Sequence, residues 1–161
     1  MRMTLHSDYA LRLLTYLGLA RGRLVTADEV AKAFGLSKNH LMKVILGLVH
    51  HGHVESVRGR GGGIRLARVP EAIGIGAVIR DTEDNFALVE CLGPNNLCVI
   101  TGACRLEHIL RDALVAYLAV LDKYTLADLV REPELARLLQ IKPERPPAVS
   151  PVSAGLSPTG G

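Results

Sequence analysis

The chain has 161 residues, of which 48% are hydrophobic but only 4% aromatic, with no Trp, so we expect a core of Leu, Val, Ile and Ala. No apolar stretch reaches the roughly 18 residues that a membrane span needs. Asp8 and Arg12 interrupt the segment that would be apolar in a signal peptide. We therefore expect a cytoplasmic protein rather than a membrane-spanning or secreted one.

The net charge of +3 is distributed unevenly along the chain. Residues 1–69 carry eleven Lys and Arg against four Asp and Glu, whereas residues 70–161 carry eight against twelve. A basic N-terminal half favours a polyanionic partner, and the acidic remainder indicates a different task.

Two amphipathic helices are predicted first. Residues 4–20 have an apolar stripe, with Ser7 as the candidate N-cap and Asp8 in the first turn, where the helix dipole favours an anion. A second helix begins at Thr26, which has Glu29 three residues later, the spacing of a capping box. Gly35 then ends this helix.

A third helix is predicted over residues 38–51, with Ser37 as its N-cap and an apolar face at helical spacing. Together with the second helix and the short turn between them, it forms a helix-turn-helix. Such pairs also occur as packing modules that never touch DNA. The solvent face favours DNA binding, because donors gather at its N-terminal end; they are Lys38, Asn39, His40 and Lys43.

Two short alternating segments, residues 54–57 and 64–66, then predict a β-hairpin with a basic, glycine-rich tip. A phosphate-binding P-loop is excluded, because no Lys-Ser/Thr pair follows and the next element is a strand. The hairpin is therefore a wing, whose Arg58, Arg60 and Gly61 are candidates for contact with the DNA backbone. The fold class is mainly α with a small β wing, and residues 1–70 form a winged helix-turn-helix domain.

Residues 71–131 are predicted to contain a short helix over 73–84, a loop with all the cysteines, a long helix over 105–121 and a helical turn over 125–130. The long helix is apolar all round from residue 113 to 121, which indicates burial on two sides, against its own subunit and against a second copy. A homodimer also suits the paired half-sites of a palindromic operator. Residues 132–161 are expected to be a largely disordered tail, since five of the eight prolines follow residue 141.

The three cysteines, Cys91, Cys98 and Cys104, lie within fourteen residues of a polar loop. They could be inert buried side chains, form a disulfide, or bind zinc or an iron–sulfur cluster. Structural zinc usually uses a closer pair of cysteines. The wide spacing, six and then five intervening residues, favours the cluster without excluding the other readings.

The chain resembles the iron–sulfur winged-helix repressors, and among them the nitric-oxide-sensitive repressors more than the regulators of cluster assembly. The resemblance covers about residues 1–130. It rests on five segments in the same order, which are residues 7–12 (SDYALR), 37–43 (SKNHLMK), 57–64 (VRGRGGGI), 91–106 with the cysteines, and 124–130 (YTLADLV).

The resemblance implies a homodimer crossed by the long helix, with one iron–sulfur cluster per subunit, 4Fe–4S or 2Fe–2S, held by the three cysteines. A carboxylate of the partner subunit can complete such a site, and Asp8 stands at that position. Relatives that regulate cluster assembly use a His three residues after the last cysteine. That residue is Glu107 here, with His108 beside it, so all three remain candidates and Asp8 is preferred.

The implied function is a transcriptional repressor that releases its operator when nitric oxide reaches the cluster. A sensor of cluster status, redox state or iron in the same family is the alternative. An enzyme is not expected, because the sequence has no nucleophile elbow, nucleotide-binding glycine fingerprint or zincin motif. A ferredoxin-like electron carrier would need neither the basic helix nor the wing.

Overall fold

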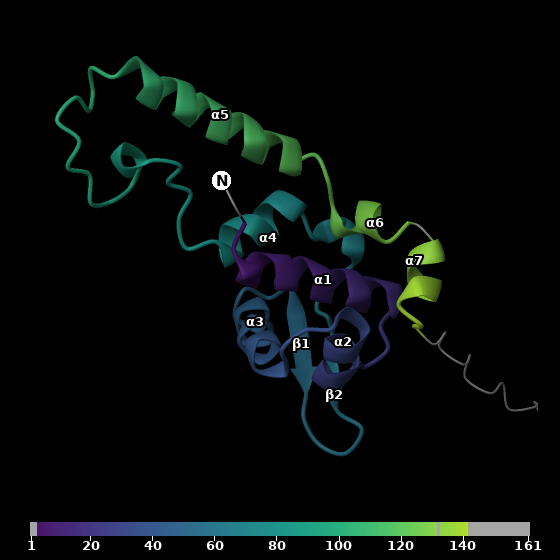
Figure 1. Ribbon diagram of the computed structural model, residues 1–161. Coiled ribbons are helices and arrows are strands. Elements are labelled where there is room, and N and C mark those ends of the chain that lie inside the picture. Colours follow the sequence, from purple (N-terminus) through teal and green to yellow (C-terminus); the bar gives the residue numbers. More distant parts are fainter. Residues whose placement is uncertain (1–2, 132, 142–161) are drawn as a thin grey trace, which may run out of the picture.

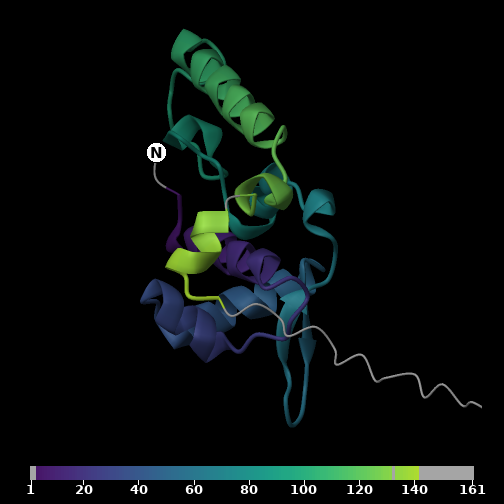
Figure 2. The ribbon, with the colours of Figure 1, turned by 90° about the vertical axis from the view of Figure 1, so that its right-hand side faces the viewer.

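The computed structural model describes residues 3–131 and 133–141. It confirms a mainly helical fold with one small antiparallel sheet. The long helix α5 lies at one end of the molecule and the wing hairpin at the other (Figures 1 and 2). The elements in chain order are α1 (Leu5–Leu19), α2 (Ala27–Phe34), α3 (Lys38–His50), β1 (Val54–Val57), β2 (Gly63–Leu66), η1 (Pro70–Ala72), α4 (Ile75–Thr82), η2 (Glu90–Leu92), α5 (Arg105–Leu121), α6 (Leu126–Leu129) and α7 (Pro133–Leu138).

Helix α1 is capped by Thr4, so the prediction that Ser7 is its N-cap was wrong. The Thr4 hydroxyl accepts a hydrogen bond from the backbone N–H of Ser7 at 3.2 Å. Ser7 is fully buried, and its hydroxyl accepts a hydrogen bond from Thr82 of α4 at 2.9 Å. Both residue types can cap a helix, but Ser7 bonds to another helix instead.

Thr26 caps α2 as predicted, accepting a hydrogen bond from the backbone N–H of Glu29 at 3.2 Å. The Glu29 carboxylate is held mainly by other donors than the backbone N–H of Thr26. It accepts hydrogen bonds from Arg23 at 3.1 Å and from the Tyr16 hydroxyl at 2.8 Å. These bonds join α2 to α1 and to the turn between them.

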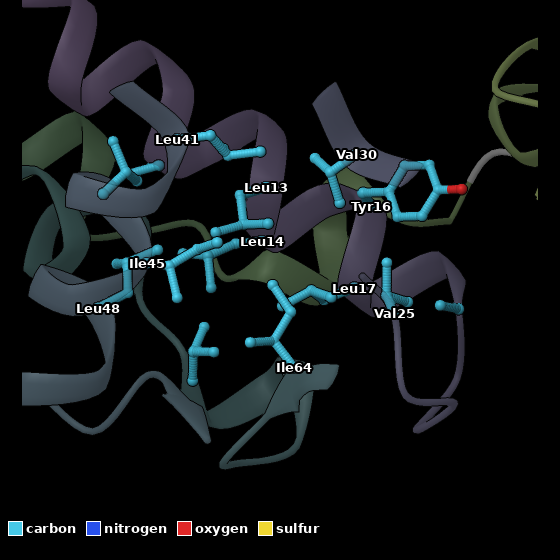
Figure 3. Packing of buried hydrophobic residues seen from close by; sticks show 14 of the residues in the cluster. Leu13, Leu14, Tyr16, Leu17, Val25, Val30, Leu41, Ile45, Leu48 and Ile64 are labelled. Atoms are coloured by element: carbon cyan, nitrogen blue, oxygen red, sulfur yellow. The ribbon is translucent and has the colours of Figure 1, made fainter. Parts of the chain in front are cut away.

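The core lies between α1, α3 and the wing (Figure 3). The predicted apolar face of α3 is confirmed, since its four residues are 0 to 4% exposed. Burial of side chains of this size contributes about 1.5–3 kcal/mol each. The residues that meet in the centre are Leu13, Leu14 and Leu17 of α1, Leu41, Val44, Ile45 and Leu48 of α3, and Val25, Val54 and Ile64 around the sheet.

The wing is an antiparallel hairpin in which Val54 pairs with Leu66 and Val57 with Gly63. Val25, between α1 and α2, extends the sheet by one bridge, with hydrogen bonds of 2.9 and 2.8 Å to Ile64. A Cβ atom on Gly63 would lie 2.7 Å from the carbonyl oxygen of Val25, so this close approach requires glycine. The wing is thereby attached to the helical body.

Helix α5 has the predicted bounds and is anchored to α4 at its C-terminal end. Arg80 donates two hydrogen bonds to Asp122, of 2.6 and 2.7 Å, and Ile75 donates from its backbone to Tyr124 at 2.9 Å. The Arg80 guanidinium holds the pKa of Asp122 below its usual range. No helix among the described residues has both the length and the apolar character needed to cross a membrane.

The C-terminal segment differs from the expected disordered tail as far as residue 141. Residues Pro133–Leu138 form α7, and Leu139 and Ile141 pack against the core cluster. Apolar side chains at these positions give the segment a surface to bury. The proline-rich part of the expected tail, residues 142–161, lies outside the described residues.

Candidate DNA-binding surface and cysteine loop

The first turns of α3 expose the four side chains proposed from the sequence to contact DNA, and Lys43 and Asn39 are among them. Lys38 lies within 2.8 Å of the Asp28 carboxylate of α2, so part of its charge is already balanced. The imidazole of His40 lies beside Tyr9 of α1, with ring centroids 6.4 Å apart. The structure thus keeps these residues on one exposed surface and shows a Lys38 contact that the sequence did not predict.

The wing tip carries Arg58 and Arg60 on a turn that only glycines allow. Gly59 and Gly61 have φ angles of 104° and 78°, in the left-handed region. A Cβ on Gly62 would lie 2.3 Å from the carbonyl oxygen of Val57. Both arginines and Gly61 are exposed, so the tip offers two guanidinium groups and an accessible backbone to a polyanion.

The cysteine loop, residues 83–104, connects α4 with α5 and extends to one side of the molecule (Figure 1). Cys91 lies in η2, and Cys104 is the N-cap of α5. The carbonyl oxygen of Cys98 accepts a hydrogen bond from the backbone N–H of Thr101 at 3.2 Å, which closes the turn that follows it. All three thiols are free and partly buried. Apart from η2, the loop has no helix or strand, so side-chain hydrogen bonds help to determine its conformation.

Two polar side chains hold the middle of the loop. Glu90 accepts a hydrogen bond from the backbone N–H of Leu97 at 3.0 Å. Asn96 accepts one from the N–H of Cys98 at 2.9 Å, which fixes the backbone of the second cysteine. Neither residue was predicted from the sequence to hold the loop, although Glu90 is the immediate neighbour of Cys91.

Glu107 closes the C-terminal end of the loop. One carboxylate oxygen accepts from the N–H of Gly102 at 3.1 Å and the other from Arg111 at 2.8 Å. These bonds hold the pKa of Glu107 below its ordinary value. The residue is 6% exposed. Because Glu107 is almost fully buried and both of its oxygens accept hydrogen bonds within the subunit, it is the least accessible of the three candidates for a fourth ligand.

The other two candidates are more accessible. Asp8 is in the first turn of α1. Arg12 donates to one of its carboxylate oxygens at 3.0 Å and lies 2.8 Å from the other, and the Asp8 side chain is 36% exposed. His108 is exposed in the first turn of α5. Both side chains are therefore accessible on the surface of the described subunit.

The cysteines fit an iron–sulfur cluster by their chemistry more than by their positions. Burial, followed by the negative charges of Glu107 and Cys98, raises the pKa of the Cys91 thiol. Three soft sulfur donors on one turn-rich loop suit iron. Within residues 3–131 and 133–141, however, no three His, Cys, Asp or Glu side chains are close enough together to hold a metal ion. The thiols must therefore approach one another to share one cluster.

Comparisons with known proteins agree on the kind of protein. The profile of the Rrf2 family, described as an iron-dependent transcriptional regulator, matches residues 3–132. The chain is 54% identical over 145 residues to the HTH-type transcriptional regulator NsrR of Bacillus subtilis (strain 168), covering 88% of this chain and 99% of that protein. It is 49% identical over 146 residues to the regulator of the same name from Halalkalibacterium halodurans, covering 89% and 100%.

Solved structures show the same fold. The oxidized form of Staphylococcus aureus CymR superposes with a TM-score of 0.65 at 25% identity, covering 82% of this chain and 98% of that one. T. potens IscR superposes with a TM-score of 0.65 at 27% identity, covering 85% and 91%.

Proposed function

The chain belongs to the Rrf2 family of transcriptional regulators, and from this premise we propose a repressor that releases its operator when nitric oxide reaches an iron–sulfur cluster in the cysteine loop. Its named relatives are DNA-binding regulators and not enzymes, as the sequence predicted. The observation that carries the proposal is the position of the loop. It follows directly on α4, which is hydrogen-bonded to the first turn of α1 through Thr82 and Ser7.

DNA recognition is assigned to α3 and the wing. We propose that Asn39, His40 and Lys43 reach base edges and neighbouring phosphates in the major groove, with Lys38 at its margin. Arg58, Arg60 and the backbone of Gly61 would contact the phosphates or minor groove beside them. The exposure of all these residues supports this assignment.

The functional unit is proposed to be a homodimer on a palindromic operator in the cytoplasm. One side of α5 faces its own subunit, whereas the other exposes apolar side chains, with Leu106 at 57%, Ile109 at 54% and Val120 at 50% exposure. Ala113 and Ala116 lie among these exposed side chains and allow a second helix to approach closely. A second copy that crosses here would bury the whole stripe.

Cys91, Cys98 and Cys104 are proposed to hold one 4Fe–4S or 2Fe–2S cluster per subunit, with Asp8 of the partner subunit as the fourth ligand. The bound cluster supplies iron with one oxygen ligand, which is the weak position for a small molecule such as nitric oxide. The thiolates hold the loop closed, and Asp8 ties it to a helix of the DNA-binding domain. Without the cluster and Asp8, the loop would keep only its local turns. These turns are held by the hydrogen bonds of Glu90, Asn96 and Glu107.

Release follows from the geometry of paired recognition helices. Two half-sites require a fixed separation of the α3 helices, so a change at the first turn of α1 lowers operator affinity. Iron and sulfide analysis of anaerobically purified protein tests the proposal. Stoichiometric iron and sulfide that are lost in Cys98→Ala, with the dimer retained, would support it. A colourless protein with one zinc per subunit would contradict it.

A further inference from the structure

A buried histidine joins the wing to α4. His53 immediately precedes β1 and is only 2% exposed. Its Nδ1 atom lies 2.8 Å from Nη2 of Arg68, and its Nε2 atom lies 2.6 Å from a carboxylate oxygen of Asp81. Each ring nitrogen therefore has one hydrogen-bond partner.

The chemistry of these partners determines where the ring carries its proton. A guanidinium group only donates hydrogen bonds, so Nδ1 of His53 must accept. A carboxylate accepts, so Nε2 carries the hydrogen and donates it to Asp81. The arrangement therefore requires the neutral ring in its Nε2–H form, because a proton on Nδ1 would point at Arg68.

The same residues close the open end of the hairpin. Arg68 follows β2 and also donates from Nε to the carbonyl oxygen of Gly52 at 3.1 Å. Ala67 donates from its backbone to the carbonyl oxygen of His53 at 3.0 Å. A hairpin with two strands of only four residues has little support of its own, so these bonds at its base set its direction.

Asp81 belongs to the last turn of α4, where two neighbours contact the first turn of α1. Thr82 donates to Ser7 at 2.9 Å, and the Glu83 carboxylate accepts from the backbone N–H of Thr4 at 2.9 Å. The cysteine loop begins at Glu83. One helical turn therefore touches the loop, the wing base and the helix that carries Asp8.

We propose that His53 is a positioning residue for DNA binding, through which the last turn of α4 orients the wing. Asp81 holds the ring, and the ring holds Arg68 at the end of β2. The proposal rests on the proposed role of the wing in DNA binding. It adds His53, which does not touch DNA itself but determines whether Arg60 can reach the DNA.

A double-mutant cycle tests this dependence. In the otherwise unchanged chain, Arg60→Ala should lower affinity for DNA about tenfold at 0.1 M salt, the effect of one phosphate contact. In an Asp81→Ala background, the same change should cost less than about twofold, because the wing no longer holds its position. His51→Gln is the matched control, since His51 lies 3.6 Å from the other Asp81 oxygen and is more exposed. An undiminished Arg60 effect in Asp81→Ala would overturn the proposal.

A second measurement needs no variant and separates this proposal from that of the wing. Two-dimensional NMR of protein labelled with ¹⁵N-histidine should show His53 as the Nε2–H tautomer at pH 8. A ring protonated at Nδ1 would overturn the inference.

If Arg60→Ala alone leaves affinity unchanged, the DNA role of the wing fails. The inference that His53 orients the wing is then judged by amide exchange in β1 and β2, which Asp81→Ala should accelerate and His51→Gln should not.

Discussion

Glu107 accepts a hydrogen bond from the backbone N–H of Gly102 at 3.1 Å, across the last turn of the cysteine loop. Gly102 has a φ angle of 84°, a left-handed conformation that suits glycine. The carboxylate therefore acts on the shape of the loop that ends at Cys104. We expect it to support the cysteine loop rather than to bind the cluster.

The variant Glu107→Ala tests that distinction. We expect faster amide exchange at Gly102 and neighbouring residues, because the N–H loses its acceptor, and an unchanged visible spectrum of freshly loaded protein. Asp8→Ala is the comparison and should alter the spectrum. A spectral change in Glu107→Ala as large as that in Asp8→Ala would identify Glu107 as a ligand after all.

DNA contacts divide into two kinds with different signatures. Arg60→Ala should weaken binding to all sequences alike and lower the salt dependence by about one unit of slope, as expected for one phosphate. Asn39→Ala should instead change which bases are preferred and leave the salt slope in place. Binding to a randomised operator library at two salt concentrations measures both. Equal loss of sequence preference in the two variants would contradict the assignment.

The exposed stripe of α5 predicts the dimer interface. Ile109→Lys places a charge in the centre of the apolar face, which costs several kcal/mol on burial, of the order given for unpaired charges. We expect a folded monomer at micromolar concentration in analytical ultracentrifugation. Asp112→Asn, an exposed position on the same helix, is the control and should stay dimeric. A dimer of unchanged affinity in Ile109→Lys would place the interface elsewhere.

Glu29 gives the DNA-binding domain a defined dependence on pH. The hydrogen bond from Arg23 is the largest cause that lowers the pKa of Glu29 below its ordinary value of 4.5. The ionised Glu29 carboxylate therefore stabilises the folded state above pH 4.5. This stabilisation is lost as the pH falls through the lower pKa that Glu29 has in the folded state.

Glu29→Gln should reduce the stability of the protein at pH 7 by on the order of 1 kcal/mol, since the side chain is partly exposed. It should also flatten the loss of stability as the pH falls below 4.5. Urea unfolding at several pH values measures both effects. Glu55→Gln is the control, because Glu55 pairs with Arg65 on the exposed surface of the wing. Equal pH profiles for Glu29→Gln and the unchanged chain would contradict this role.

Local signals were sufficient for the elements that define the fold. The bounds of α5 and the start of α3 at Lys38 agree with the predictions, because apolar periodicity and flanking caps act over a few residues. The wing was predictable for a similar reason, since Gly59, Gly61 and Gly63 satisfy positive φ angles or a close backbone approach.

Long-range partners explain what the sequence left open. Ser7 is of a residue type that caps helices, but it bonds to Thr82, 75 residues away in the sequence. The contact of His53 with Asp81, 28 residues later, has no local signature. The cysteines were recognisable as a group from their spacing, whereas their mutual geometry depends on how the loop closes.

The most direct test of the account is operator affinity before and after nitric oxide. Anaerobically purified protein should bind the operator tightly, and stoichiometric nitric oxide should weaken binding at least tenfold, about 1.4 kcal/mol. Cys98→Ala should bind weakly in both conditions. Unchanged affinity of the loaded protein after nitric oxide, with its spectrum visibly altered, would contradict the central claim that the cysteine loop controls DNA binding.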